Sequence, residues 1–556
     1  MINSFRVNHF FYEYIGIMKK LCLLFFVLFP LFVFSQEEAW VYFSAKANEQ
    51  YYYDSPLQML SQRALDRRTT QNIPLDFKDV PINQSFISTI KAVSGIQVMA
   101  KSKWLNAIHV RGSQSSINSL KDFDFVAKVD FANKGLNEAN TIVSVSKGVL
   151  QHKKKSKKER TVKASDGYAL QIEMLNGQFL HQENFKGSGK IIAVLDAGFL
   201  GVDEASVFKK IRDNNQILGG YNFVARDDSF YAHDDHGTNV LSTMAAYTEN
   251  SLIGTAIDAS YYLFVTEDVT VENPVEESLW VEAAEKADSL GVDIINSSLG
   301  YTEFDNPVYN HTYEQRNGST AFISKGAEIA FSRGMLVVVS AGNEGTTSTP
   351  YIGAPADAFS VIAVGAVDSN RNKADFSSIG PSADGRVKPD VMALGKHAIV
   401  SDENGNSILL NGSSFSAPII SGMLACLWQA YPDKTNEEIR ELLLQSSNRY
   451  TAPDNEYGFG IPDFNLALSN GSSLKKEIFP YYVAYPNPTS DFVTVQFPPN
   501  FNSGKLLFYS VLGQKVLEEK VHDYQAVFSL EALNKGLYFY KIESDFFYRY
   551  GKIIKN

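Results

Sequence analysis

Short runs rich in valine and isoleucine alternate with helical stretches through the middle of the chain. Five such runs occupy residues 191–195, 262–265, 292–296, 335–340 and 361–364. Helical spacing fills the intervals, as at 277–290 and 326–333. Apolar runs separated by helices predict parallel strands that are covered on both faces. We therefore expect an α/β domain whose functional groups gather beyond the carboxyl ends of the strands.

Three residues in this part of the chain are of the types that catalyse acyl transfer. Asp196 follows the first run, His236 precedes a Gly-Thr pair, and Ser414 stands in a Gly-Ser-Ser stretch. A serine nucleophile needs a base to take its proton and a carboxylate to orient that base. The chain order Asp, His, Ser is one in which these three groups recur. Ser414 is therefore the candidate nucleophile, His236 its general acid and base, and Asp196 the orienting carboxylate.

The developing oxyanion also needs hydrogen-bond donors. Asn343 follows the fourth run by a short turn, and its side-chain amide could serve. The backbone N–H of Ser414, at the start of a helix expected to run through residues 416–428, would be the second donor. Any one of these residues alone would be typical of a helix cap or a loop. The prediction of a catalytic site therefore rests on their occurrence together.

Five blocks of this region resemble the signature blocks of the subtilisin-like serine peptidases. They occupy residues 194–198, 236–240, 296–300, 340–345 and 411–418 and occur in the order found in that family. The resemblance covers about residues 168–469. It implies a subtilisin-like parallel sheet flanked by helices and a serine endopeptidase that forms an acyl-enzyme on Ser414. A catalytically silent surface binding protein or adhesin on the same fold is the alternative.

The resemblance also implies a substrate-binding edge. In the family, the substrate pairs as an added strand with a segment here formed by Ser298, Leu299 and Gly300. Ala341 and Gly342, together with Asn343, would border the main specificity pocket. The chain departs from the usual family residues at Ala197, Leu394, Ser413, Phe415 and Ser416. None of these departures removes a catalytic group.

An α+β unit is expected ahead of this domain, over residues 37–135. Strand and helix patterns occur in the order β, α, β, α-like, β at residues 40–43, 61–68, 104–110, 114–120 and 126–129. Their order and position resemble the propeptides of the same family, which assist folding and plug the active site. The resemblance implies a zymogen that has its own propeptide as an intramolecular inhibitor.

A basic linker is expected at residues 136–167. Six basic side chains and no apolar residue lie within residues 153–160, so this run must be solvated. We hypothesise a processing cut between Phe131 and Tyr168. Farther upstream, residues 18–36 have the basic start, apolar run and small residue of a signal peptide, which places a signal at 1–35 with Met18 as the natural start. A membrane anchor is the alternative, although Pro30 interrupts the short run.

The last part of the chain, residues 478–556, has short alternating strands at 492–497, 505–509, 525–530 and 537–542. They predict a β-sandwich-like domain. The Pro-Asn-Pro turn that starts at Pro486 and the segments 535–542 and 551–555 resemble the C-terminal sorting domain of type IX secretion. This implies export through the periplasm of a Gram-negative-type bacterium to the medium or cell surface, with the secretion machinery as a partner. An ordinary β-sandwich is the alternative.

The resemblance implies protein or peptide substrates as the remaining partners. The net charge of -11 argues against binding nucleic acid. Cys22 and Cys426 permit no disulfide framework once the signal is removed, and Cys426 is expected to be a buried apolar residue. The implied chemistry requires no cofactor. Structural calcium is frequent in the family but no residues locate it, and the pair His233 and His236 lacks the spacing of a zinc site.

Overall fold

The computed structural model describes residues 36–137, 159–161, 167–249, 251–473, 483–485, 488–496, 503–511, 514–521, 525–543 and 548–556. The predicted signal peptide and most of the predicted linker lie outside these ranges, so both stay predictions. None of the helices within these ranges combines the length and the apolar character that a membrane span requires.

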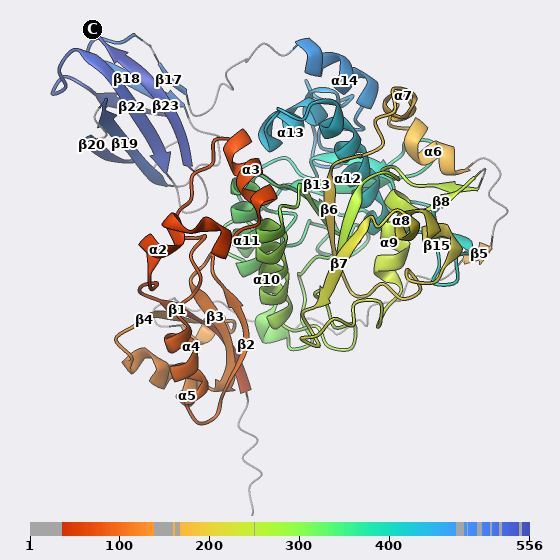
Figure 1. Ribbon diagram of the computed structural model, residues 1–556, viewed down its shortest axis with the longest axis horizontal. Coiled ribbons are helices and arrows are strands. Elements are labelled where there is room, and N and C mark those ends of the chain that lie inside the picture. Colours follow the sequence, from red (N-terminus) through yellow and green to blue (C-terminus); the bar gives the residue numbers. More distant parts are fainter. Residues whose placement is uncertain are drawn as a thin grey trace, which may run out of the picture.

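A seven-stranded parallel sheet forms the centre of the largest domain (Figure 1). Its strand order is β14-β13-β12-β11-β6-β10-β7. The strands are β6 (Ile191–Asp196), β7 (Ile217–Asn222), β10 (Ser260–Val265), β11 (Ile294–Ser297), β12 (Leu336–Ser340), β13 (Ile362–Val367) and β14 (Val391–Leu394). The five predicted strands are confirmed at the centre of the sheet. The two strands that the sequence patterns missed, β7 and β14, form its edges.

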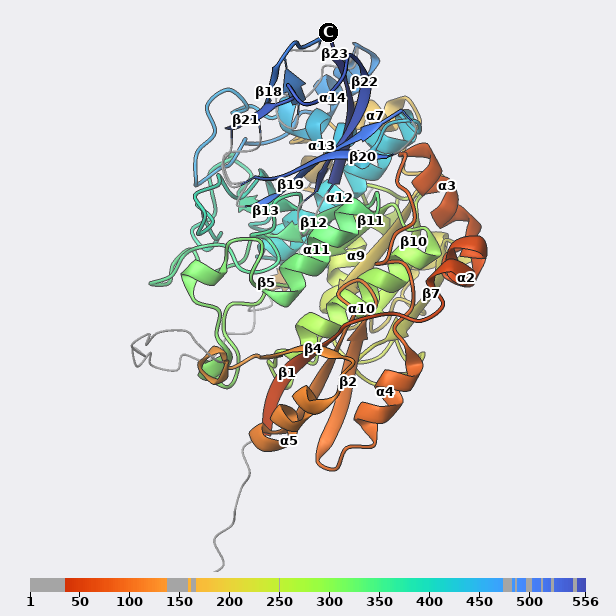
Figure 2. The ribbon, with the colours of Figure 1, turned by 90° about the vertical axis from the view of Figure 1, so that its left-hand side faces the viewer.

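Helices cover both faces of this sheet. Helices α10 (Val275–Leu290) and α11 (Phe322–Ser332) pack together on one face, and α9 (His236–Ala245) and α12 (Ser413–Ala430) pack together on the other (Figure 2). Helix α12 is apolar and buried along almost its whole length, because it lies against β11, β12, β13 and β14. The predicted α/β architecture is therefore confirmed. Cys426 lies on α12 and is fully buried, as expected.

The N-terminal unit, residues 36–137, is called the leader domain below. It contains a four-stranded antiparallel sheet with the order β2-β3-β1-β4. Its elements are β1 (Gln36–Phe43), α3 (Gln62–Thr70), α4 (Gln84–Lys91), β2 (Ile96–Ser102), β3 (Ala107–Ser113), α5 (Gln114–Ser119) and β4 (Val126–Phe131). The five predicted elements are confirmed, except that β3 starts only at Ala107, and the structure adds α2 (Glu49–Asp54), α4 and β2, which the sequence patterns missed. The residues before it form a turn in which Asn106 has a φ of 48°.

The leader domain packs against α10 and α11 of the central domain (Figures 1 and 2). Glu285 on α10 accepts three hydrogen bonds from the turn at residues 102–104, at 2.6–3.0 Å. Trp40 of β1 donates its indole N–H to Ser278 of α10 at 2.8 Å, and its ring stacks on Phe322 of α11 at 5.0 Å between centroids. The contact is therefore both apolar and specifically hydrogen-bonded.

A cluster of buried charges forms a second contact between the two domains. Arg68 of α3 pairs with Asp79 of the leader domain and with Asp288 of α10, each at 2.8 Å. Arg67 also pairs with Asp288, and Arg333 of the central domain lies 3.6 Å from Asp79. All five side chains are almost completely buried. We call these five residues the arginine anchor.

Removing one member of the arginine anchor should destabilise the uncut chain. Breaking a buried ion pair from one side costs about 3–5 kcal/mol, because a charge is left without its partner. We expect Arg68→Met to lower the urea midpoint of the chain by a corresponding amount, measured by intrinsic fluorescence. Lys209→Met is the control, since its pair with Asp213 is exposed and screened by water. Equal midpoints for the two variants would contradict the expectation.

The C-terminal domain is a β-sandwich. A three-stranded sheet with the order β17-β18-β21 faces a four-stranded sheet with the order β20-β19-β22-β23. The strands are β17 (Val483–Tyr485), β18 (Phe492–Gln496), β19 (Gly504–Ser510), β20 (Lys515–Val521), β21 (Gln525–Ser529), β22 (Gly536–Glu543) and β23 (Tyr548–Lys555). Side chains from both sheets, including Val493, Phe508 and Ile542, share a core separate from that of the central domain. The predicted sandwich is confirmed, with β17, β20 and β23 added.

Candidate active site

Asp196 and His236 meet at the carboxyl edge of the central sheet. Asp196 is the last residue of β6 and is fully buried, while His236 is the first residue of α9. The Nδ1 atom of His236 lies 2.7 Å from Oδ1 of Asp196. The same oxygen accepts the backbone N–H of Ala197 at 2.8 Å. This pairing directs the other imidazole nitrogen, Nε2, away from Asp196.

The surroundings of His236 favour its protonated form. Burial lowers the pKa of the imidazole, but the charge and hydrogen bond of Asp196 outweigh burial and raise that pKa above its ordinary value of 6.5. The carboxylates of Glu267 and Asp234 raise it further. The imidazole side chain keeps an exposed fraction of 31%. The residue can therefore exchange a proton with a molecule bound from solvent.

Ser414 lies in the first turn of α12, beside this pair. The ring of Phe415, the next residue of the helix, lies near the His236 imidazole, with 6.1 Å between the two ring centroids. The hydroxyl of Ser414 donates to the carbonyl oxygen of Ser298 at 3.3 Å, and Ser298 Oγ donates to the carbonyl of Ser414 at 2.8 Å. No hydrogen bond joins Ser414 to His236 within the part of the chain that the structure describes. In this structure the Ser414 hydroxyl is therefore engaged by the Ser298 carbonyl and not by His236.

Asn343 and the start of α12 hold two N–H groups ready for an anion. Oδ1 of Asn343 accepts from the backbone N–H of Ser413 at 2.9 Å and from its hydroxyl at 3.1 Å. Because the oxygen is engaged in this way, the Nδ2 amide of this exposed side chain remains as a donor. Among the described residues no acceptor takes the backbone N–H of Ser414. The positive end of the α12 dipole adds to the attraction for an anion.

Ser413 is the functional residue for which the sequence analysis predicted no role. Its single hydroxyl proton lies between two acceptors, the Gly342 carbonyl at 3.0 Å and Asn343 Oδ1 at 3.1 Å, and its oxygen accepts the Gly342 N–H at 3.1 Å. Gly342 has a φ of 108°, a conformation that glycine adopts readily. The position of Ser413 immediately before Ser414 was the available signal. Ser413 therefore ties the Gly342–Asn343 turn to the start of α12.

The expected substrate-binding segments border this site. Ser298 and Leu299, which follow β11, are buried, whereas Gly300 is exposed. Tyr301 continues the segment and pairs with Ala354, whose carbonyl accepts the Tyr301 N–H at 2.8 Å. Ala341 is buried, and its N–H donates to the Val364 carbonyl at 2.9 Å. The structure thus brings together all nine residues proposed from the sequence: Asp196, His236, Ser298, Leu299, Gly300, Ala341, Gly342, Asn343 and Ser414.

Replacing Asn343 by alanine should remove one oxyanion donor. Loss of a comparable donor lowers kcat by about 10²–10³-fold. We expect kcat of Asn343→Ala to fall by that factor with KM nearly unchanged, because the donor acts mainly on the transition state. Steady-state hydrolysis of a chromogenic peptide measures both constants. A rise in KM without a change in kcat would assign Asn343 to ground-state binding instead.

The imidazoles of His233 and His236, the first residue of α9, have different partners. Nε2 of His233 lies 2.7 Å from the side-chain nitrogen of Asn222, whereas His236 faces Asp196. No group of three or more His, Cys, Asp or Glu side chains in the described ranges is arranged to hold a metal ion.

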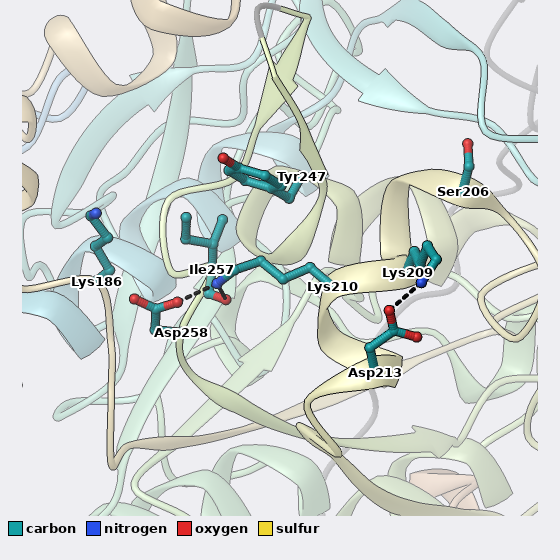
Figure 3. A pocket seen from close by; sticks show the side chains of 8 residues that line it. All are labelled: Lys186, Ser206, Lys209, Lys210, Asp213, Tyr247, Ile257 and Asp258. Carbon is teal, nitrogen blue, oxygen red and sulfur yellow. Dashed lines mark hydrogen bonds and ion pairs between the residues drawn. The ribbon is translucent and has the colours of Figure 1, made fainter.

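A hollow of about 480 Å³ lies elsewhere on the central domain (Figure 3). Lys210 pairs there with Asp258, and Lys209 pairs with Asp213. Asp258 precedes β10, so the hollow lies at the amino edge of the sheet, opposite to Asp196. It takes no part in the site at the carboxyl edge.

Three segments of the chain match known protein families. Residues 187–460 match the subtilase family, residues 38–148 match the peptidase S8 propeptide domain of Bacteroidota, and residues 483–556 match the secretion system C-terminal sorting domain.

Two subtilisins agree with the first match. Subtilisin NAT of Bacillus subtilis subsp. natto is 32% identical over 299 residues, which are 53% of this chain and 70% of that protein. A subtilisin of Bacillus pumilus is 31% identical over 53% of this chain and 97% of its own length. The crystal structure of MycP1 with its propeptide removed is 22% identical, with a TM-score of 0.44 over 54% of this chain and 96% of that one.

Proposed function

Because the chain belongs to the subtilase family of serine endopeptidases, we propose that it hydrolyses peptide bonds through an acyl-enzyme on Ser414. The observation that carries this proposal is the 2.7 Å contact between Asp196 and His236 beside the first turn of α12. Asp196 holds the imidazole so that Nε2 is the basic atom, and it stabilises the imidazolium that forms.

The reaction follows from these positions. His236 Nε2 takes the proton of Ser414 as Oγ attacks the carbonyl carbon of the substrate, and the oxyanion binds Asn343 Nδ2 and the Ser414 N–H. His236 then gives this proton to the leaving amine, and the C–N bond breaks. A water molecule attacks the ester through the same base and releases the acid. Side chains and backbone supply every group for these steps, so we propose that catalysis requires no cofactor, with structural calcium left unassigned.

The flanking domains indicate how the enzyme is made and delivered. The leader domain is a subtilase propeptide, and the sandwich is a type IX sorting domain, so the chain is a secreted or cell-surface protein of a Gram-negative-type bacterium. We further propose that the leader domain keeps the enzyme inactive until it is cut. The substrates would be extended proteins or peptides, because Ser298–Gly300 offers backbone groups to a strand.

Labelling with a fluorophosphonate tests the proposal against a silent binding protein of the same fold. An activated serine reacts with this probe, whereas an ordinary hydroxyl does not. We expect one labelled peptide that contains Ser414, and no label in Ser414→Ala. Absence of label in the folded, processed wild-type protein would favour the binding protein.

A further inference from the structure

Glu267 lies at the carboxyl edge of the central sheet, beside the candidate catalytic pair. Val265, the last residue of β10, pairs with Asp196, and Thr266 donates its N–H to the Asp196 carbonyl at 3.0 Å. Glu267 follows directly and is half-buried. Burial lowers the pKa of His236, whereas the charges of Asp196 and then of Glu267 raise it. The Glu267 carboxylate therefore lies within electrostatic range of the candidate base.

The same carboxylate acts on Tyr301, which directly follows the expected substrate-binding segment Ser298–Gly300. Burial raises the pKa of the Tyr301 hydroxyl, and the negative charges of nearby carboxylates, with Glu267 the strongest of them, raise it further. One charge thus acts both on the base and on the residue next to the substrate-binding edge. Glu267 therefore lies close to the place where a substrate would bind.

Two buried hydroxyls in the same neighbourhood have no hydrogen-bond partner in the described part of the chain. They are Thr266 Oγ1, adjacent to Glu267, and Tyr301 Oη. Both side chains are almost completely buried. Buried polar atoms are nearly always paired, so an unpaired one indicates a group that the chain itself does not supply, such as a water molecule or a ligand. A hydroxyl can accept a hydrogen bond from a cationic group or from a water molecule that bridges to it.

The loop that carries Glu267 is fixed by Glu276 in the first turn of α10. The two side-chain oxygens of Glu276 accept the backbone N–H groups of Asp268 at 2.8 Å and of Asn273 at 3.0 Å. A group on a fixed loop loses little conformational freedom when a ligand binds to it. Glu267 is therefore held ready for a partner from outside the chain.

The strand order indicates which substrate residue would meet Glu267. The order β12-β11-β6-β10 places the Ala341–Asn343 turn on one side of Ser298–Gly300 and Glu267 on the other. Side chains of an extended peptide point alternately to opposite sides. The substrate residue that ends at the cut bond would enter the pocket bordered by Ala341–Asn343. The residue before it would then point toward Glu267.

We propose that Glu267 binds a lysine or arginine side chain at the second residue ahead of the bond that Ser414 cuts. This inference rests on the proposed function and names the class of its substrates. Asp234, whose Oδ1 accepts the His236 N–H at 2.9 Å, adds a second negative charge at this edge. A carboxylate with hydroxyl acceptors beside it matches the N–H donors of a cationic side chain, whereas a neutral aliphatic side chain offers these acceptors no donor.

Two quenched fluorescent peptides test this preference. The parent is a peptide that the processed wild-type protein cuts, and the pair differs only in having lysine or norleucine at the second residue ahead of that bond. Norleucine has the apolar stem of lysine without its charge. We expect kcat/KM to be at least about tenfold higher for the lysine peptide, which is the discrimination that one hydrogen bond to a charged group supplies. Equal or lower kcat/KM for the lysine peptide, with product masses that show the same cut, would overturn the inference.

Glu267→Gln separates the charge of the side chain from its shape. We expect the ratio of the two kcat/KM values, lysine over norleucine, to fall about tenfold. The ratio is the readout because Glu267 also affects the pKa of His236, and a change of that pKa affects both peptides alike. Asp213→Asn is the matched control, since it removes a carboxylate at the opposite edge of the sheet and should keep the wild-type ratio. A wild-type ratio in Glu267→Gln would contradict the proposed role.

Reversing the charge is a second, independent variant. Glu267→Lys should prefer glutamate over lysine at the same substrate position, the opposite of the wild type. Reaction of each variant with the fluorophosphonate at Ser414 shows that its site is folded. A Glu267→Lys enzyme that takes the label and still prefers lysine would show that another group binds the cation.

The two levels of proposal fail differently. If the wild-type protein reacts with the fluorophosphonate at Ser414 and cuts the two peptides at equal rates, the inference about Glu267 is wrong and the endopeptidase proposal stands. If the wild-type protein takes no label and cuts no peptide, both are wrong.

Discussion

Ser414→Ala is expected to lower kcat for peptide hydrolysis by about 10⁶-fold, the loss known for removing the nucleophile of a subtilisin, which is a relative of this chain. The hydroxyl is the only atom of this side chain that can form the acyl-enzyme. His236 and Asp196 cannot compensate, since they act through that hydroxyl. Peptide binding should persist, because Ser298–Gly300 and the Gly342–Asn343 turn do not need the Ser414 hydroxyl. Chromogenic peptide hydrolysis gives the rate, and fluorescence anisotropy with a labelled peptide gives the affinity.

Ser416→Ala is the matched control for this loss. Ser416 lies on the same helix, is fully buried, and donates to the Ala393 carbonyl at 3.2 Å. Its removal perturbs packing near the site without touching the proposed chemistry. We expect kcat/KM to change by less than about tenfold, equivalent to one modest hydrogen bond. A Ser414→Ala enzyme with more than a hundredth of the wild-type activity would exclude Ser414 as the nucleophile.

Asp196→Asn is expected to lower kcat by about 10⁴-fold while leaving the fold intact, because the amide favours the wrong imidazole tautomer. It should also change the pH profile. Asp196 raises the pKa of His236, and only the neutral imidazole accepts the Ser414 proton. The activity of the wild type should therefore rise with pH through a midpoint above 6.5, the ordinary value for histidine. In Asp196→Asn that midpoint should move down toward 6.5.

The kcat/KM of each protein measured against pH shows both effects. Asp213→Asn is the control, because it removes one carboxylate from an exposed ion pair at the opposite edge of the sheet. We expect this control to keep the wild-type rate and midpoint. A midpoint in Asp196→Asn equal to that of the wild type would mean that other carboxylates set the pKa of His236.

The centre of the fold was predictable because its strands are buried on both faces. Residues 191–195 and 335–339 are apolar without interruption, the pattern of strands that are buried on both faces. The edge strands were not predictable in this way. Strand β7 is partly exposed and contains Gly219 and Gly220, which are weak strand formers. Strand β14 is buried but follows Pro389 and Asp390 with no helical pattern before it, and β20 carries charges on most of its length.

The sequence was enough to predict which residues form the candidate site. It was not enough to predict how their side chains contact one another. Asp196, His236 and Ser414 were recognisable from their order and neighbours. The bond between the Ser414 hydroxyl and the Ser298 carbonyl depends on side-chain torsions, which no motif encodes. The arginine anchor was equally hidden, since it joins Arg68 to Asp288 across more than two hundred residues of sequence. Long-range pairs of this kind follow from the packing of two domains and not from local pattern.

The arginine anchor has a kinetic consequence. Asp288 is buried on the central domain, yet the two cations that neutralise it belong to the leader domain. Cutting the linker leaves these ion pairs intact, and separating the domains exposes them to water one by one. On the proposal that the leader domain keeps the enzyme inactive, proteolytic activity is expected only after a lag that follows the cut. The rate at which the leader domain dissociates would set the length of that lag.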